Sequence, residues 1–292
     1  MLGSLMASSA AIWVRFLPGE SPIAIAFIRV AGAALLLLPW FWREWRRRGG
    51  LSWGELRFSL LAGVALALHF ATWIASLQYT TVAHSVLFVA THPMFVIAIS
   101  VGLLRVPVAR NQIVGAMVAL AGVAFIQWRD LDFKAPAGLF TGPARGDLLA
   151  LAGGLFAAVY LLLGREARRN LSTILHVEVT YASAAVVLLA MVLVLRVPLV
   201  PPSNSSWIYL ALLVLLPTVG GHTIFNWGLR HLGAPLVSLF GLLEPVEAAF
   251  LALIILGEGL PATTVLGAGV ILGGLGLAVW RRAPLAGDLN QS

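Results

Sequence analysis

The sequence predicts an all-α integral membrane protein whose ten transmembrane helices form a 5+5 inverted-topology repeat. Of its 292 residues, 60% are apolar and only 11% are charged, and the mean hydropathy is +0.95. Soluble domains carry about 25% charged residues. Apolar runs of about 20 residues, the length that spans a hydrocarbon core, recur along the chain as far as Trp280. The short alternating segments typical of a membrane barrel do not occur in the sequence.

Ten apolar runs define the expected spans. They lie near residues 2–16, 21–42, 56–78, 81–104, 111–128, 147–164, 171–195, 206–229, 234–256 and 262–280. Turn-forming residues separate several of them, as in Leu17-Pro18-Gly19 and Pro201-Pro202. Ten such helices use about 200 residues, so the loops are short and no separate soluble domain is expected.

The basic residues predict the orientation of the chain in the membrane. With the N-terminus inside, thirteen arginines face the cytoplasm, at positions 43, 46–48, 57, 105, 110, 165, 168, 169, 230, 281 and 282. Five basic residues face outwards: Arg15, Arg129, Lys134, Arg145 and Arg196. Because cytoplasmic loops carry the excess of Lys and Arg, both termini are predicted to be cytoplasmic, in a multi-pass protein of the cell inner membrane.

The remaining composition excludes several classes of protein. The net charge of +7 comes from arginines between apolar spans, so it indicates topology rather than nucleic-acid binding. The chain has no Cys, which excludes disulfides and Cys-ligated metals. The first span starts at once, without a charged n-region or cleavage site, and no removable signal peptide is expected.

The two halves of the sequence repeat with a shift of 152 residues. This shift places Pro93 on Pro245, Gly115 on Gly267 and Gly122 on Gly274, without a gap from Leu77 to Arg281. Each unit holds an odd number of spans, so the second must cross the membrane in the opposite sense. Inverted repeats of this kind are typical of transporters that bind substrate at mid-membrane between the halves.

The repeat also sets the predicted domain boundaries. The first five-helix repeat covers residues 1–130 and the second covers 147–282. Residues 131–146 form the outer connecting loop, and residues 283–292 form a cytoplasmic tail. Small residues on the fifth and tenth spans form small-xxx-small faces that let helices pack closely: Gly115, Ala119, Gly122, Gly269, Gly273 and Gly274. A weak homodimer through the tenth span is the alternative to a monomer.

Three stretches resemble the EamA family of the drug/metabolite transporter superfamily. They are WIASLQYTTVAHSVLFVATHPMFVIAIS at 73–100, NWGLRHLGAPLVSLFGLLEPVEAAFLALIILGEGL at 226–260 and GAGVILGGLGLAV at 267–279. Arg29 within AFIRVAGAALLL and the motif Leu256-Gly257-Glu258 add to the resemblance. It implies ten helices in a 5+5 inverted repeat around a central cavity, and export of amino acids, metabolites or drugs.

A narrower resemblance is to the bacterial exporters of aromatic amino acids. His69, Trp73, Ala90 and His92 stand at positions similar to the cavity lining of that subfamily, although some of these positions carry larger aromatics there. The first half has Leu104-Arg105-Val106 where the family often has Leu-Gly-Glu. The resemblance implies an aromatic amino acid or a similar small molecule as substrate.

Depth along the spans selects candidate substrate-binding residues. His69, His92 and Glu244 fall near the bilayer midplane at 1.5 Å per residue, where ionisable groups face a cavity or a partner. The alternative is that the histidines are neutral and bonded to carbonyls of a neighbouring helix. His92 and Glu244 are equivalent under the shift of 152, each directly before a proline. A proline frees a carbonyl one turn earlier, which offers a polar point beside a cavity.

Aromatic side chains complete the predicted site. Ser85, Phe88, His92 and Phe95 recur on one helical face of the fourth span. Trp73 and Tyr160 are expected as two walls, together with Ala90 and with Phe240, the repeat partner of Phe88. Such a stripe often serves packing alone, but here it includes a histidine, and aromatic faces with a few polar groups suit a small organic ligand.

Three more ionisable residues are expected inside the spans. Arg29 and Glu247 lie at equal depth and have opposite charge, which predicts a buried ion pair. The alternatives are a gate that opens during transport, or an Arg29 that meets a substrate carboxylate. Glu178 has no evident partner at its depth except Arg57 or Arg230. Protonation of Glu178, Glu244 or Glu247 could couple export to a proton gradient, and downhill transport is the other possibility.

Other functions fit the sequence less well. An intramembrane enzyme needs a zinc motif or aspartates within its spans, and all four Asp lie in loops or the tail. A channel needs rings of like charge or a repeated filter. The predicted function is therefore export of small organic metabolites, aromatic amino acids above all, by alternating access and without a cofactor or bound metal. A polyspecific drug exporter or an exporter of other amino acids is the alternative.

Overall fold

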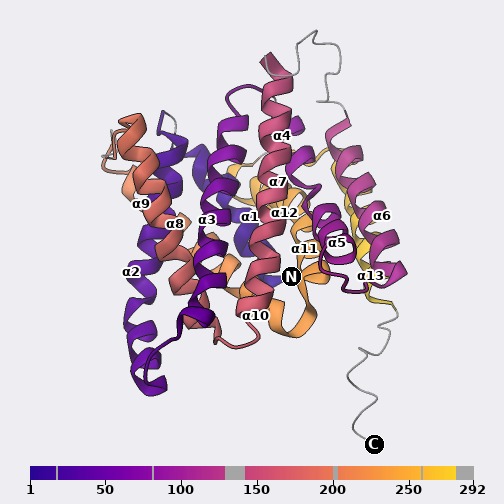
Figure 1. The fold of residues 1–292 in the computed structure, drawn as a ribbon. Helices are drawn as coiled ribbons and strands as arrows, with labels where there is room; N and C mark the ends of the chain where they lie inside the picture. The colour runs from indigo at the N-terminus through magenta and orange to yellow at the C-terminus, as the bar shows by residue number, and fades with distance from the viewer. Residues whose placement is uncertain (18, 81, 129–141, 200–202, 258, 281–292) are drawn as a thin grey trace, which may run out of the picture.

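The computed structural model is an all-helical bundle (Figure 1). It describes residues 1–17, 19–80, 82–128, 142–199, 203–257 and 259–280, and these residues contain no strand. The elements of the first half are α1 (Leu2–Arg15), α2 (Pro22–Arg48), α3 (Trp53–Ser76), α4 (Val82–Val89), α5 (His92–Gly102) and α6 (Arg110–Gln127). Those of the second half are α7 (Gly142–Ala167), α8 (Thr173–Leu195), α9 (Ser206–Leu213), η2 (Val214–His222), α10 (Thr223–Leu232), α11 (Ala234–Phe240), η3 (Gly241–Leu243), α12 (Glu244–Leu256) and α13 (Ala262–Val279).

Eight helical segments of the described chain are long and apolar enough to cross a membrane. The predicted spans at 2–16 and 111–128 are not among them. Helix α1 has 14 residues, about 21 Å of helix, and α6 has 18 residues that begin with Arg110-Asn111-Gln112. Ten crossings and the side of each terminus therefore stay predictions. The predicted loop at 131–146 and tail at 283–292 lie largely outside the described residues, and α7 already begins at Gly142.

Two predicted spans are interrupted in the middle of the bundle. Helix α4 ends at Val89 and α5 begins at His92, directly before Pro93. In the second half, the 3-10 turn η3 separates α11 from α12, which begins with Glu244-Pro245. A proline has no N–H to donate and its ring clashes with the carbonyl four residues earlier. Both breaks follow from this chemistry, at positions equivalent under the shift of 152.

A third irregularity is the π-helix η2, which contains Pro217. The proline leaves the carbonyl of Leu213 without its usual donor. The Thr218 hydroxyl fills this place and donates to the Leu213 carbonyl at 2.7 Å. π-Helical turns inside α-helices are often found at functional sites.

A tight turn joins α2 to α3 at the arginine-rich end of the bundle. Gly49 ends α2 with φ of 80°, a left-handed conformation that glycine adopts without strain. Ser52 and Glu55 then form a capping box at the start of α3, and Glu55 also forms an ion pair with Arg48. The turn thus fixes the two helices as antiparallel neighbours.

Helices α6 and α13 lie side by side (on the right in Figure 1) and pack through glycines. Gly115 faces Gly274, and Gly122 faces Gly267, so the two helices run antiparallel. Under the shift of 152, Gly115 corresponds to Gly267 and Gly122 to Gly274, so the two contacts are equivalent to each other. Such reciprocal contacts are the property of a two-fold interface. Close packing is confirmed for Gly115, Gly122 and Gly274, whereas a Cβ at Gly269 or Gly273 would meet nothing within 4 Å, so these two glycines do not take part.

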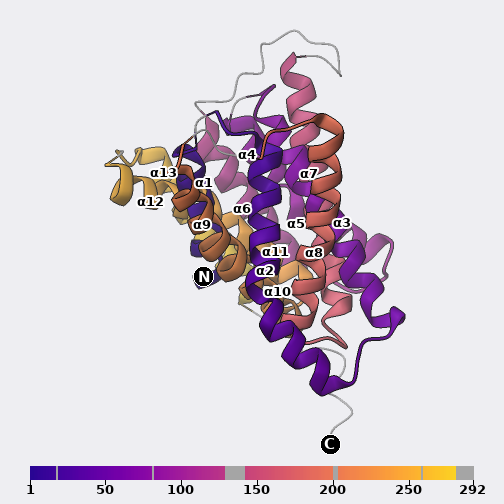
Figure 2. The same ribbon diagram turned by 90° about the vertical axis from the view of Figure 1, so that its left-hand side faces the viewer.

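The other helices surround the same centre. Helix α2 packs against α8, as Figure 2 shows, while α3 packs against both α7 and α8. Helix α1 packs against η2 and α12. The largest apolar core joins α2, α3, α7 and α8, and includes the buried side chains of Phe70 and Tyr181. A second core joins α5, α6, α11 and α13. The interrupted helices end between these two cores.

We expect Gly274→Leu to destabilise the bundle. A Cβ at Gly274 would lie 2.6 Å from the Ala119 nitrogen and the Gly115 carbonyl oxygen, two backbone atoms that cannot move aside. Overpacking costs about 1–3 kcal/mol, which should lower the midpoint of thermal unfolding in detergent by several degrees. The neighbouring Gly273→Leu is the control, because a Cβ there meets nothing within 4 Å. Equal shifts in the two variants would contradict the packing assigned to α6 and α13.

Candidate functional site

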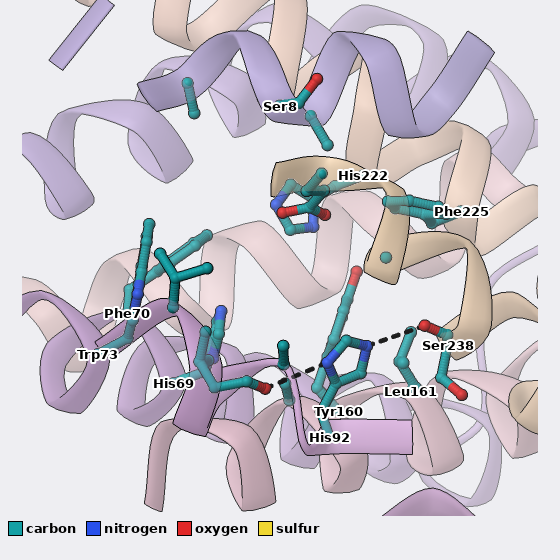
Figure 3. A pocket seen from close by; sticks show the side chains of 18 of the residues that line it. Ser8, His69, Phe70, Trp73, His92, Tyr160, Leu161, His222, Phe225 and Ser238 are labelled. Atoms are coloured by element: carbon teal, nitrogen blue, oxygen red, sulfur yellow. Dashed lines mark hydrogen bonds between the residues drawn. The ribbon is translucent and has the colours of Figure 1, made fainter. Parts of the chain in front are cut away.

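A cavity of about 200 Å³ lies where the interrupted helices meet (Figure 3). Its walls come from α1, α3, α7, the α4–α5 break, the η2–α10 segment and the α11–α12 break, with one residue of α2. The lining is mainly apolar and aromatic and carries a small number of polar groups. This composition is typical of sites for small organic ligands.

The cavity is built from equivalent positions of the two halves. Six pairs of lining residues are related by the shift of 152: Ser8 and Tyr160, Phe70 and His222, Trp73 and Phe225, Val86 and Ser238, Val89 and Gly241, and His92 and Glu244. The pairs come from elements far apart in the chain. The cavity therefore lies at the centre of the interface between the halves.

His92 bridges the two halves across the floor of the view in Figure 3. Its Nε2 lies 3.0 Å from the Ser238 carbonyl oxygen of α11, and its Nδ1 lies 3.2 Å from the Val89 carbonyl oxygen. Val89 is four residues before Pro93, so its carbonyl is the one that the proline deprives of a donor. A neutral imidazole has one N–H and can donate to only one of these carbonyls at a time.

His69 and Trp73 form one aromatic wall on α3. Their rings stack with centroids 6.1 Å apart and an interplanar angle of 4°. The Nδ1–H of His69 donates to the Gly153 carbonyl of α7 at 2.9 Å, which leaves Nε2 as an acceptor. A side chain at Gly153 would crowd Trp73, with its Cβ 3.1 Å from the Trp73 Cβ. Glycine is therefore required for α7 to approach this wall so closely.

The geometry of the histidines is compatible with both interpretations. His69 and His92 line the cavity, and each also has a carbonyl partner on a neighbouring helix. Trp73, Ala90, Tyr160 and Glu244 line the cavity too. Whether these residues bind a substrate stays a prediction.

Phe88 and Phe240 lie outside the cavity lining, contrary to expectation. The prediction assumed one continuous helix through Ser85, Phe88 and His92, but the break before Pro93 changes the register between them. The Phe88 ring instead lies near the His84 ring, with the two ring centroids 6.2 Å apart. Phe240 packs against the second apolar core.

Sequence analysis missed several lining residues. His222 contacts the ring edges of Phe70 and Tyr160, at centroid distances of 5.7 and 6.3 Å. Phe225 is the repeat partner of Trp73, and His222 is the partner of Phe70. Applying the shift of 152 to the aromatic residues of the third span would have identified both.

Arg29 is buried and held by two contacts. Its Nε donates to Thr218 Oγ1 at 3.2 Å, and its guanidinium lies 4.6 Å above the Phe70 ring. The Tyr181 hydroxyl, on the residue equivalent to Arg29, donates to the Thr218 carbonyl at 3.0 Å. The π-helix thus positions the guanidinium at the edge of the cavity, where Arg29 is part of the lining.

The predicted ion pair of Arg29 with Glu247 does not form in this structure. Glu247 lies outside the cavity lining and accepts a hydrogen bond from the Ser4 hydroxyl of α1 at 2.9 Å. Glu178 is buried on α8, also outside the cavity, and its Oε2 has no hydrogen-bond partner among the described residues. Depth alone could not predict these partners, because the faces of the helices decide them. Gating by Arg29, Glu247 or Glu178 stays a prediction.

A buried hydrogen-bond network lies beside the cavity at the end where α7 and α8 are joined. Asn226 donates to the Tyr160 hydroxyl at 2.5 Å and accepts from His176 Nε2 at 3.0 Å, while His176 Nδ1 lies 2.9 Å from the Ser59 hydroxyl. Arg168 donates to the Asn226 carbonyl at 3.2 Å. This network ties α3, α7, α8 and α10 together directly beside the cavity wall formed by Tyr160.

The opposite end of the cavity has different polar contacts: Ser76 Oγ lies 2.7 Å from Ser85 Oγ, and the Thr80 hydroxyl donates to Asp147 at 2.6 Å. The repeat equivalents of Ser59, His176 and Asn226 are Ala211, Ala24 and Ile74, none of which has a polar side chain. The described residues also contain no group of three or more His, Cys, Asp or Glu that could hold a metal ion. The cavity therefore has an apolar and aromatic lining with a few polar groups, which suits a small organic ligand.

A bundle of apolar helices, broken around a central cavity, defines the class of polytopic membrane proteins with a site between repeated halves. The sequence model of the EamA-like transporter family matches residues 1–128 and again residues 144–280. The chain therefore belongs to the EamA-like transporter family. It is a multi-pass membrane protein of a transporter family.

Two similar proteins carry transporter names. An "uncharacterized transporter" of Archaeoglobus fulgidus is 25% identical over 285 residues, which cover 96% of this chain and 94% of the relative. The "uncharacterized transporter YyaM" of Bacillus subtilis is 24% identical over 264 residues, which cover 89% of this chain and 85% of the relative. A solved crystal structure resembles this fold with a TM-score of 0.77 over 99% of this chain and 96% of its own, at 18% identity. That last likeness concerns the fold alone.

Proposed function

We propose that this transporter exports small organic metabolites across the cell inner membrane by alternating access, with aromatic amino acids as its substrates. The observation that carries the proposal is the cavity made of six pairs of repeat-equivalent residues. Transporters with inverted repeats bind their substrates near mid-membrane between the repeats, in sites formed by discontinuous helices. Both α4–α5 and α11–α12 are discontinuous at this cavity.

Two findings support the inverted 5+5 repeat. The family model matches each half of the chain separately. Helices α6 and α13, the predicted fifth and tenth spans, pack antiparallel through reciprocal glycine contacts. Antiparallel equivalents related by a two-fold axis are what inversion of the second half requires.

The chemistry of the cavity supports an aromatic substrate of modest size. Trp73, Phe70 and Phe225 provide aromatic faces and edges, and His69 provides a free acceptor nitrogen. Offset-stacked or edge-to-face aromatic pairs contribute roughly 0.5–1.5 kcal/mol beyond area burial. The volume of about 200 Å³ lies below the ~300–1,000 Å³ of sites for drug-sized ligands. This size favours a single amino acid over a large drug.

The buried network at one end of the cavity is consistent with alternating access. A carrier must open its cavity to one side of the membrane at a time. Asn226 and His176 lie at the end nearest Arg168, which the distribution of arginines assigns to the cytoplasm. Breaking this network is the step that we infer for opening the cavity to cytoplasmic substrate.

We expect proteoliposomes to take up Phe and Trp in preference to Thr. Trp73→Ala and His92→Ala should each lower the rate of Trp transport about tenfold, because each removes part of the aromatic and polar lining. Trp40→Ala is the control, since Trp40 is 58% exposed and lies outside the cavity. Flux that saturates and is stimulated by substrate on the opposite side would distinguish a carrier from a channel. Thr transport equal to that of Trp, with both cavity variants normal, would rule out the aromatic substrate class.

Asn226→Leu should open the cytoplasmic end of the cavity more often. It leaves His176 and Tyr160 without a shared partner, and an unpaired buried polar group costs about 1–3 kcal/mol. The chain has no native Cys, so a single cysteine at the lining position Ala157 can be labelled selectively. We expect a several-fold faster reaction with an impermeant thiol reagent applied from the cytoplasmic side. Asn204→Leu, at an exposed position, is the control. An unchanged rate would contradict the gating role of the network.

The topology is tested with single cysteines at three exposed positions. Replacements of Arg46 and Arg169 should react with an impermeant reagent only from the cytoplasm, and a cysteine in place of Asn204 only from outside. The physical reason is the accumulation of arginine in cytoplasmic loops. Labelling of Arg46→Cys and Arg169→Cys from opposite sides would exclude the proposed inverted arrangement.

A further inference from the structure

Two side chains of opposite formal charge, Arg29 and Glu244, line the same cavity. No ion pair within 4.0 Å joins them, nor does either form one with another residue of the described chain. Ionisable groups inside a membrane protein are expensive and usually mark a functional site. The charges of this pair are therefore available to something that enters the cavity.

Arg29 presents only part of its guanidinium to the protein. Its Nε is bonded to Thr218 and its face lies on Phe70. The two terminal nitrogens have no hydrogen-bond partner in the part of the chain that the structure describes, and neither is fully enclosed by protein atoms. Fixing Nε and the ring face orients these two donors while leaving them unused. A planar pair of donors matches a carboxylate, which can accept both hydrogen bonds in parallel.

Glu244 shows the complementary arrangement. Its carboxylate forms no hydrogen bond with the described residues and is not fully enclosed. It lies on the first turn of α12, at the break next to Gly241, where a Cβ would come within 3.9 Å of Glu244 Oε1. Its neighbour Glu247 already accepts a hydrogen bond from Ser4. Glu244 is thus the acidic group that a cationic part of a ligand can reach.

We propose that Arg29 binds the carboxylate and Glu244 the α-ammonium of a zwitterionic amino acid. This inference rests on the proposed transport function and assigns the polar ends of the substrate. The net charge of the two protein groups is zero, as is that of the amino acid, so binding pairs every charge in the cavity. The aromatic wall of His69 and Trp73 then remains for the side chain of the substrate. Amines without a carboxylate and acids without an ammonium each leave one protein charge unpaired.

Three ligands test this assignment on the purified full chain in detergent. They are L-phenylalanine, phenethylamine, which lacks the carboxylate, and 3-phenylpropanoate, which lacks the ammonium. Hydrogen bonds to charged groups contribute about 1.5–3 kcal/mol, so phenylalanine should bind at least about tenfold more tightly than either analogue by calorimetry. Equal affinity for the three ligands overturns the proposal, even if the wild-type protein transports phenylalanine.

Two variants then assign each pole of the ligand. Arg29→Gln should remove the preference for phenylalanine over phenethylamine, while Glu244→Gln should remove the preference over 3-phenylpropanoate. Arg57→Gln and Glu166→Gln replace charges outside the cavity and should leave both ratios unchanged. A uniform loss for all three ligands, with the unfolding temperature retained, overturns the assignment of that residue.

A folding defect leaves the test intact. If Arg29→Gln is unstable because Thr218 loses its donor, Arg29→Lys keeps the positive charge and should keep a preference for phenylalanine over phenethylamine. Loss of that preference in stable Arg29→Lys protein contradicts the carboxylate site. A wild-type protein that neither binds nor transports any aromatic amino acid refutes the proposed function itself, which is a different result from equal binding of the three ligands.

Discussion

The structure depends on how broken helices satisfy their backbone carbonyls inside a lipid bilayer. Water is absent there, so each carbonyl freed by a proline needs a partner from the protein. Near Pro93, His92 lies within hydrogen-bond distance of the freed Val89 carbonyl. Near Pro217, the Thr218 hydroxyl donates to the freed Leu213 carbonyl. Each break therefore places a polar side chain beside the centre of the bundle.

These polar groups organise the rest of the cavity. His92 reaches from its own break to the Ser238 carbonyl, so it connects α5 to α11 across the interface of the halves. Thr218 accepts the Arg29 Nε–H and thereby orients a guanidinium on α2. The position of the Arg29 guanidinium at the edge of the cavity is in this way a consequence of the helix break at Pro217. Small residues such as Gly153 let the surrounding helices approach closely enough to complete the walls.

The two halves are equivalent in framework and different in chemistry. The reciprocal glycines of α6 and α13 preserve the two-fold relation, whereas His92 and Glu244 occupy equivalent positions with unlike side chains. The hydrogen-bond network of His176 and Asn226 also has no polar counterpart in the other half. A transporter with two identical ends would have no preferred closed side. The differences between the halves make the two ends of the cavity chemically distinct.

The sequence by itself determined the membrane class, most of the spans, the internal repeat and the choice of His69, His92 and Glu244, which line the cavity. Hydropathy and periodicity report length and depth, which depend only on local composition. Only the tertiary structure decided that Phe88 turns away from the cavity and that Arg29 bonds to Thr218 rather than to Glu247. The reason is that a proline break changes the helical register, and contacts between distant helices depend on the faces that pack together, which the pattern of one helix does not specify.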